Sequence, residues 1–164
     1  VMEKLLDLII YILKNYPNPV ELSKPRLVKI IYLVDWKFCL SHQRQLTNIQ
    51  WYFDHFGPYV NDVIQLIESN PDIFESTSYQ TIQGYIGHNF KLRETSKNIN
   101  ITLNPDEVKI VDFVLSKTYK LNWNQFIDLV YSTYPIQNSS RYTKLNLIEA
   151  SREYSSTNIK VASV

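Results

Sequence analysis

The sequence predicts a mainly helical α+β domain, in which helices pack around one buried central helix (about 23–40) and a small antiparallel sheet lies to one side. Three observations support this class. Residues 27–38 are apolar on almost every helical face, which is typical of an enclosed helix. Apolar residues recur at helical spacing in several other segments. Within residues 74–92 they instead alternate with polar residues, which is typical of strands.

An amphipathic helix is expected over residues 2–16, and Pro17 ends it. The central helix is predicted to begin at Ser23 and Pro25, because a hydroxyl can cap a helix and the fixed φ of proline suits the first turn. After it, residues 41–48 are polar and indicate a loop. Residues 49–53 have the composition of a short strand.

A turn is expected over residues 54–58, where Gly57 stands at a cap position and Pro58 at a first helical position. This pattern predicts a helix from Pro58 to residue 68. The alternating segment 74–92 is predicted to form strands, with Gly84 and Gly87 marking a bend or a bulge. A further short strand is expected over residues 99–103, which alternate in the same way.

The clearest helix start in the sequence is Asn104, followed by proline and two acidic residues. It offers a cap, a proline in the first turn and negative charge where the helix dipole favours it. We expect helices over residues 105–119, 123–134 and 144–154. The single domain is expected to span residues 1–154, and residues 155–164 to form a loose tail.

The composition excludes several classes of protein. The balance of 45% hydrophobic and 20% charged residues over a length of 164 fits one globular domain. A formal net charge of +1 provides no overall field that attracts nucleic acid or an anionic membrane. The single cysteine, Cys39, cannot form an internal disulfide and fits a cytoplasmic protein. The apolar run at residues 5–13 is far below the ~20 residues of a membrane span.

Side chains with catalytic or metal-binding chemistry are few. Cys39, His42 and His55 offer three of the four ligands that a structural zinc ion needs, so we expect no metal and no other cofactor. Asp54 and His55 could act as a catalytic base and the residue that orients it, but the side chains of adjacent residues on a strand point to opposite faces. No activated nucleophile accompanies them, so we do not expect an enzyme.

Two other features bear on binding. The helices expected at 107–119 and 123–134 have the outline of a helix-turn-helix, but the second contains no Arg or Lys to contact phosphates or bases. Aromatic residues make up 13% of the chain, including 12 tyrosines and 3 tryptophans. Such residues favour protein interfaces, and they equally fill cores with their polar atoms at the edge. Both interpretations remain open at this point.

Two blocks carry a family resemblance. Residues 29–36 read KIIYLVDW, similar to the K-L-L-Y-L-A-D helix of one family, and residues 51–60 read WYFDHFGPYV, similar to its W-Y-x-x-x-x-G-P-v turn. The order and spacing of the blocks also agree. The chain thus resembles the SocA-like antitoxin family, or Panacea domain, over residues 2–136. Val34 replaces a commoner small alanine, and the segment after Pro135 has no counterpart that aligns.

This resemblance implies a protein that neutralises a neighbouring toxin by direct contact. The founding type also acts as an adaptor that hands its toxin to a protease, and members occur on phages and mobile elements. Toxins vary widely across the family, so the resemblance does not identify the partner. The candidate motif and partner-binding residues are Lys29, Tyr32, Asp35, Trp36, Trp51, Tyr52, His55, Gly57, Pro58 and Tyr59.

We hypothesise that Lys29, Asp35 and His55 meet in one polar cluster beside the Gly57–Pro58 turn, since each is a polar position in an otherwise apolar block. The alternative is that these residues only hold the fold together and never touch a partner. For the whole protein, the second functional hypothesis is a DNA-binding regulator encoded by a phage or mobile element.

Overall fold

The computed structural model describes residues 2–162 and, within them, the side chains of residues 4–158. Its helices are α1 (Met2–Asn15), α2 (Lys24–His42), α3 (Asp62–Glu68), α4 (Pro105–Thr118), α5 (Trp123–Tyr131), α6 (Tyr134–Gln137) and α7 (Leu147–Ala162). Its strands are β1 (Tyr52–Asp54), β2 (Gly57–Tyr59), β3 (Phe74–Gln80) and β4 (Ile86–Leu92). Two single-turn 3₁₀ helices, η1 (Pro19–Glu21) and η2 (Glu94–Ser96), complete the order. The expected mainly helical α+β class is confirmed.

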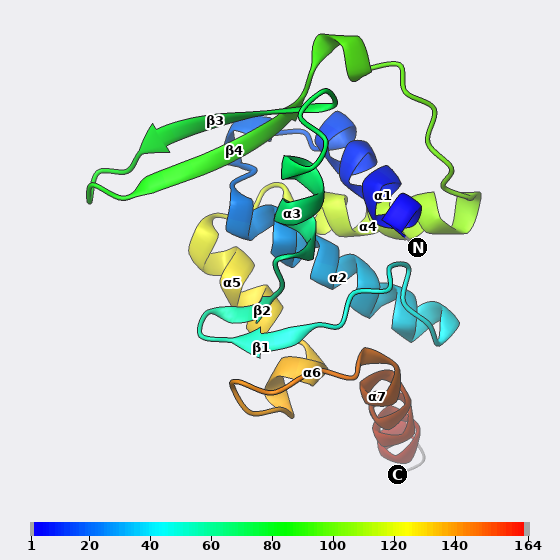
Figure 1. The fold of residues 1–164 in the computed structure, drawn as a ribbon. Helices are drawn as coiled ribbons and strands as arrows, with labels where there is room; N and C mark the ends of the chain where they lie inside the picture. The colour runs from blue at the N-terminus through cyan, green and yellow to red at the C-terminus, as the bar shows by residue number, and fades with distance from the viewer. Residues whose placement is uncertain (1, 163–164) are drawn as a thin grey trace.

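Helix α2 runs through the middle of the molecule (Figure 1). Of its 19 residues 13 are buried, among them the charged Lys29 and Asp35. It packs against α4 and α7 and against strands of both hairpins. Ser23 is the N-cap, but its hydroxyl makes no capping hydrogen bond, so Pro25 in the first turn is the local start signal that the structure uses.

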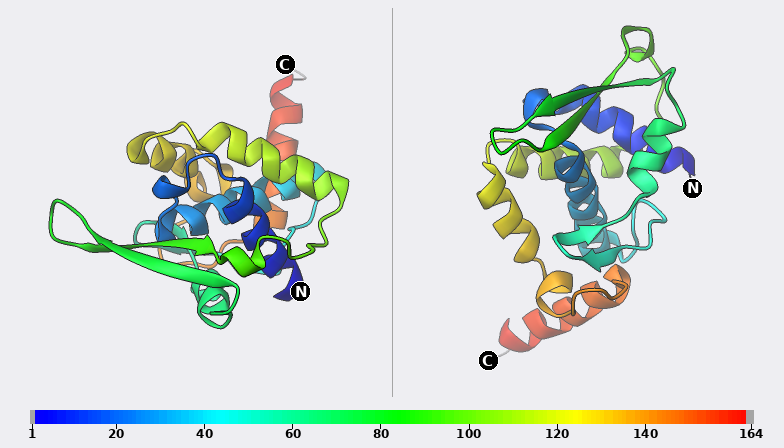
Figure 2. Two further views of the ribbon diagram at one scale, coloured as in Figure 1. Left: turned by 90° about the horizontal axis from the view of Figure 1, so that it is seen from above. Right: turned by 60° about the vertical axis from the view of Figure 1, so that its left-hand side comes forward.

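The strands form two separate two-stranded antiparallel hairpins instead of the single sheet that was expected. In β3–β4, Phe74 pairs with Leu92 and Gln80 with Ile86. This hairpin projects beyond the helices, and α7 lies at the opposite end of the molecule (Figures 1 and 2). The strand expected over residues 99–103 is absent, and this segment is a connection in which Ile99 and Ile101 pack against the core.

Residues 57–59 correct the expected helix start at Pro58. They form β2, and α3 begins only at Asp62. Gly57 has φ +100°, a backbone conformation that glycine adopts at little cost. A Cβ atom there would lie 3.3 Å from Cε2 of Tyr131 and 3.7 Å from Cε of Lys29. Glycine therefore lets the β1–β2 hairpin turn sharply and lie close against α2 and α5.

The C-terminal part begins as expected and then departs from expectation. Asn104 and Glu107 form a capping box at the start of α4, and Asn122 and Gln125 form another at the start of α5. The helix expected over 123–134 stops at Tyr131, and Pro135 sits in the first turn of α6. Helix α7 continues through Ala162, so residues 155–162 of the expected loose tail are helical. Residues 163–164 lie outside the described part.

Between α6 and α7 the chain returns to β1. The backbone N–H of Phe53 donates to the carbonyl of Thr143, and that of Leu145 donates to the carbonyl of Trp51, both across 2.9 Å. These hydrogen bonds cover the outer edge of β1. Part of the segment after Pro135, which no motif describes, thus holds the β1–β2 hairpin in place.

Candidate functional site

The buried carboxylate of Asp35 connects the two motif blocks. It accepts hydrogen bonds from the backbone N–H of Thr47 and from the indole N–H of Trp51, both across 2.9 Å, and from the side-chain amide of Gln45 across 3.3 Å. Asp35 is 0% exposed. Burial raises the pKa of Asp35 to about 6, although the hydrogen bonds from Thr47 and Trp51 oppose that rise. These contacts pin the connection after α2, and β1 beyond it, to the central helix.

Tyr32 extends this network on the next turn of α2. Its ring meets Trp51 edge to face at 5.5 Å between centroids, and its hydroxyl hydrogen-bonds to that of Thr133 across 2.8 Å. Burial raises the pKa of Tyr32. Trp36 is buried as well and meets Tyr154 of α7 edge to face. In this structure these motif residues contact the core, which supports a structural role for them.

Lys29 differs from the other buried motif residues. It is 2% exposed, yet it forms no hydrogen bond or ion pair with any described residue. Its Nζ lies 5.9 Å from the centre of the Tyr59 ring. Burial lowers the pKa of Lys29 to about 8, and the negative charge of Asp54 acts in the opposite direction. Most of the Lys29 side chain is buried, but its Nζ still reaches solvent, since the one fully buried side-chain nitrogen or oxygen without a partner in the described residues is Oδ1 of Asn89.

The hypothesised cluster of Lys29, Asp35 and His55 is not formed. Asp35 bonds to residues of the connection after α2, whereas Lys29 faces Asp54 and Tyr59. His55 is exposed, and its Nδ1 lies 3.0 Å from the hydroxyl of Tyr142. The three side chains share no partner. Residues six apart on a helix point about 120° away from each other, which separates the first two.

The other candidate residues have structural surroundings. Pro58 is buried in β2, and Tyr52 pairs with Tyr59 across the hairpin. Cys39 is buried, and the ring of His42 lies 4.6 Å from that of Phe38. Within residues 2–162, no group of three or more His, Cys, Asp or Glu side chains could hold a metal ion. In the same residues, no helix has the length and hydropathy needed to cross a bilayer.

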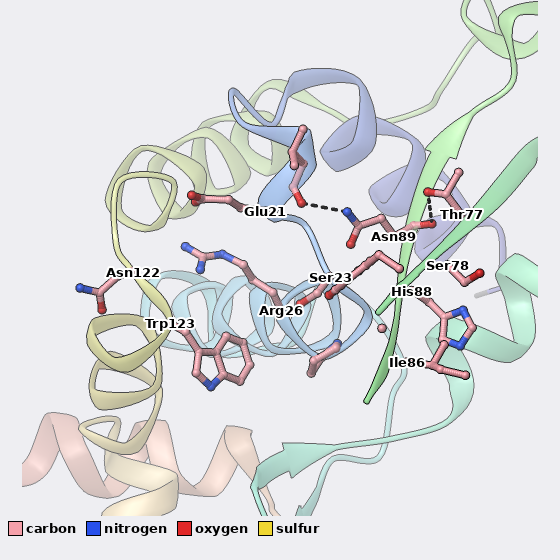
Figure 3. A pocket seen from close by; sticks show the side chains of 14 residues that line it. Glu21, Ser23, Arg26, Thr77, Ser78, Ile86, His88, Asn89, Asn122 and Trp123 are labelled. Atoms are coloured by element: carbon pink, nitrogen blue, oxygen red, sulfur yellow. Dashed lines mark hydrogen bonds between the residues drawn. The ribbon is translucent and has the colours of Figure 1, made fainter. Parts of the chain in front are cut away.

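A cavity lies where the β3–β4 hairpin passes the start of α2 and the start of α5 (Figure 3). We call it the hairpin cleft. It measures about 870 Å³ and is lined by Val20, Glu21, Ser23, Pro25, Arg26, Thr77, Ser78, Tyr79, Ile86, Gly87, His88, Asn89, Asn122 and Trp123. Figure 3 shows Trp123 of α5 facing Ile86 and His88 of β4 across it.

Glu21 and Arg26 are the two formally charged side chains that line the hairpin cleft, and Arg26 already has protein partners. Nε of Arg26 donates to the hydroxyl of Tyr16 across 2.9 Å, and one terminal nitrogen donates to the carbonyls of Thr118 and Leu121. Its guanidinium also lies 4.6 Å from the centre of the Phe126 ring. Exposed apolar side chains stand among the polar residues of the cleft, because Val20 is 79%, Ile86 71% and Trp123 43% exposed. Such a surface suits protein binding more than anion binding.

A second cavity of about 450 Å³ adjoins the first, sharing Pro25 and Trp123 with it. We call it the Lys29 pocket. It is lined by Pro25, Lys29, Asp54, Phe56, Tyr59 and Trp123. Phe56, at the tip of the β1–β2 hairpin, is 74% exposed. The pocket therefore combines aromatic walls, two opposite charges and an open mouth.

The tip of the β3–β4 hairpin carries two strongly exposed apolar side chains. Ile82 is fully exposed and Tyr85 74% exposed. The period-two pattern predicted these strands, but it gave no sign that their tip would pass the end of the core. Trp123, Phe56 and the hairpin tip were missed as surface candidates because a single sequence does not distinguish an exposed aromatic residue from a buried one.

An apolar groove on another side of the molecule lies between α2, α4 and α5. It measures about 570 Å³, and the 44% exposed Phe113 lies at its rim between Lys37 and Lys117. This groove contains no residue of the hairpin cleft or of the Lys29 pocket. It provides a comparison surface of similar chemistry.

Comparison with known proteins adds one finding. A family model described as "Antitoxin SocA-like, Panacea domain" matches residues 27–135, which is more than half of the chain. The match covers most of α2, both hairpins, α3, α4 and α5, and it therefore includes Lys29, Phe56, Trp123 and the β3–β4 hairpin. No curated protein and no solved structure matches the chain.

Proposed function

Because the chain belongs to the SocA-like antitoxin family of Panacea domains, we propose that it neutralises a toxin protein by binding it directly. The family implies a toxin as the kind of partner, and exposed apolar side chains support a contact with a protein. The observation that carries the proposal is the set of exposed apolar side chains on the β3–β4 hairpin and in the hairpin cleft. Ile82 and Tyr85 are exposed on the hairpin, and Ile86 and Trp123 are exposed in the lining of the cleft.

Physical chemistry favours protein binding at this surface. Exposed apolar side chains are unfavourable in water, and burying them against a partner releases about 25 cal/mol per Å². Aromatic residues such as Trp123 and Tyr85 bury a large area at a small cost in side-chain entropy. The projecting hairpin (Figure 1) allows a partner to contact both the hairpin and the adjoining cleft.

The alternative of a DNA-binding regulator gains no support from the surface. Helix α5, which would be the recognition helix of a helix-turn-helix, contains no Lys or Arg. The formal charge of the chain is +1. Nonspecific DNA affinity depends on clustered cations, so we expect no salt-dependent retention of DNA.

The direct test is co-purification. The chain and the protein encoded by the adjacent reading frame are expressed together with a tag on one of them, and the eluate is passed over a size-exclusion column. We expect a complex of defined stoichiometry that survives 0.5 M salt, because apolar contacts are not screened by ions. Separate elution of the two proteins would contradict the proposal. Delivery to a protease is a further step, and a shorter half-life of the toxin in the presence of the chain would demonstrate it.

A further inference from the structure

Lys29 is the one buried cation in the described part whose surroundings leave it without a hydrogen-bond acceptor. Arg26, one turn earlier on α2, is equally buried but has three protein acceptors. Lys4 reaches the buried Glu107 across 2.7 Å. The Lys29 side chain instead ends at a cavity of about 450 Å³. Its Nζ is not fully enclosed, because the one fully buried side-chain nitrogen or oxygen without a partner in the described part is Oδ1 of Asn89. The ammonium is therefore free to pair with a ligand that enters the cavity.

The walls of this cavity are aromatic. Phe56, Tyr59 and Trp123 line it together with Pro25, and two of them, Phe56 and Trp123, are substantially exposed at its mouth. A ligand that fits must therefore present an apolar stem to the rings and an acceptor to Nζ of Lys29. The side chains of Glu and Asp have this form, with methylene groups ending in a carboxylate.

We propose that the Lys29 pocket receives a carboxylate side chain of the toxin, whose oxygen pairs with Nζ of Lys29 while its stem packs between Phe56 and Trp123. This inference rests on the proposed function, since the toxin supplies the acid. The inference specifies one contact of the toxin, an ion pair with Lys29. Because the Lys29 pocket adjoins the hairpin cleft, a single partner can cover the pocket and the cleft together.

The charges near Lys29 favour a monoanion. Asp54 of β1 faces Lys29 and leaves the ammonium partly compensated without forming an ion pair with it. Tyr59 of β2 is the other titratable group of the pocket, and burial, Asp54 and Glu68 all raise its pKa, so it stays neutral. Helix α5 contributes only the uncharged Trp123. Lys29 and Asp54 are thus the two charged groups of the pocket, and an incoming carboxylate is attracted by the ammonium and opposed by Asp54, which favours a ligand with a single negative charge.

The protonation of Lys29 makes the affinity of the pocket for a carboxylate depend on pH. Burial lowers the pKa of Lys29 to about 8, so the ammonium is mostly present at pH 7 and mostly absent at pH 9. A carboxylate ligand binds the protonated form and should lose about tenfold in affinity over this interval. A neutral ligand of the same shape should bind equally at both pH values.

The test uses phenylacetate and its neutral isostere phenylacetamide as probes of the whole chain. The shift of the Trp123 indole N–H signal in NMR spectra reports binding, and Trp123→Phe assigns the signal. We expect phenylacetate to shift it with at least tenfold higher affinity than phenylacetamide at pH 7, and to lose about tenfold at pH 9. Equal affinities for the two probes, no binding of phenylacetate, or no dependence on pH would overturn the inference.

Two variants sharpen the comparison. Lys29→Met should abolish the preference for the carboxylate, and Lys109→Met, which changes an exposed lysine on α4, should leave it intact. If Lys29→Met does not fold, the pH dependence of phenylacetate binding to the unaltered chain still tests the inference. The probes need no toxin, so a failed co-purification with intact probe binding refutes the proposed function alone. A stable complex without probe binding refutes the carboxylate site alone.

Discussion

Trp51 donates its indole N–H to the fully buried carboxylate of Asp35 across 2.9 Å. One residue belongs to the central helix and the other precedes β1, so this hydrogen bond fastens the two motif blocks together. The same carboxylate orders the connection between the blocks through the backbone N–H of Thr47. The Lys29 pocket depends on this arrangement, because α2 lines one side of the pocket and the β1–β2 hairpin, which follows Trp51 in the chain, lines another.

Removal of the Asp35 carboxylate should be severely destabilising. Asp35→Ala leaves the indole of Trp51 and the N–H of Thr47 buried without an acceptor, and each orphaned donor costs about 1–3 kcal/mol. We expect a loss of ~3–5 kcal/mol in the free energy of urea-induced unfolding. The control is Asp112→Ala, whose carboxylate accepts from Tyr11 at the surface and should cost less than ~1 kcal/mol. Similar losses in both variants would contradict the role of Asp35.

The raised pKa of Asp35 predicts a dependence of stability on pH. The folded state holds this proton more tightly than the unfolded chain, because the pKa rises from 3.8 to about 6 on folding. The contribution of this proton to the free energy of unfolding is therefore fully present below pH ~4. It is lost as pH rises through about 6, by ~3 kcal/mol in total.

Asp35→Asn has no carboxyl group at this position. The difference between the unaltered chain and the variant therefore reports the titration of Asp35 separately from that of other groups. The difference in unfolding free energy between the unaltered chain and Asp35→Asn should fall by ~2.4 kcal/mol between pH 4 and pH 7. Urea titrations at four pH values measure it. A difference that stays constant or grows with pH would show that hydrogen bonds to the carboxylate outweigh its burial.

Two glycines with similar φ angles allow the cost of backbone strain to be separated from the cost of steric contact when each is replaced by alanine. Gly57 and Gly84 have φ of +100° and +88°. A Cβ atom at Gly57 would press on Tyr131, whereas one at Gly84 would meet nothing within 4 Å. Gly84→Ala should cost ~1 kcal/mol through the backbone alone, and Gly57→Ala ~2–4 kcal/mol. Thermal unfolding of both variants tests this, and equal shifts in Tm would contradict the close packing at Gly57.

The binding face is tested by two aromatic residues with almost equal exposure. Trp123 in the hairpin cleft is 43% exposed, and Phe113 beside the α2–α4–α5 groove is 44% exposed. We expect Trp123→Ser to weaken the complex with the adjacent-gene protein at least tenfold, as loss of an interface aromatic typically does. Phe113→Ser should change the affinity less than threefold in isothermal titration calorimetry. The reverse order would place the toxin on the α2–α4–α5 groove.

Local signals in the sequence predicted the elements that depend on local chemistry. The capping box of Asn104 and Glu107 starts α4 as expected, and the nearly continuous apolar surface of α2 corresponds to its burial. The Gly57–Pro58 pair was misleading, because glycine followed by proline also describes a helix start. What makes it a hairpin is packing against Lys29 and Tyr131, which lie far away in the sequence.

The candidate site was less predictable than the fold. Lys29 and Asp35 were correctly identified as polar positions on a buried helix, but their separation by six residues already places them on different faces. Their partners come from β1, β2 and the connection after α2, and no spacing rule assigns them. The segment at residues 99–103 alternates like a strand, yet no neighbouring strand pairs with it, so it remains a connection.

The most direct test of the central claim is the growth of cells that express the adjacent gene, alone and together with this chain. The account predicts arrest by the adjacent gene alone, recovery with the unaltered chain, and loss of recovery with Ile86→Asp, which places a charge on the 71% exposed wall of the hairpin cleft. Normal growth with the adjacent gene alone, or full recovery with Ile86→Asp, would contradict it.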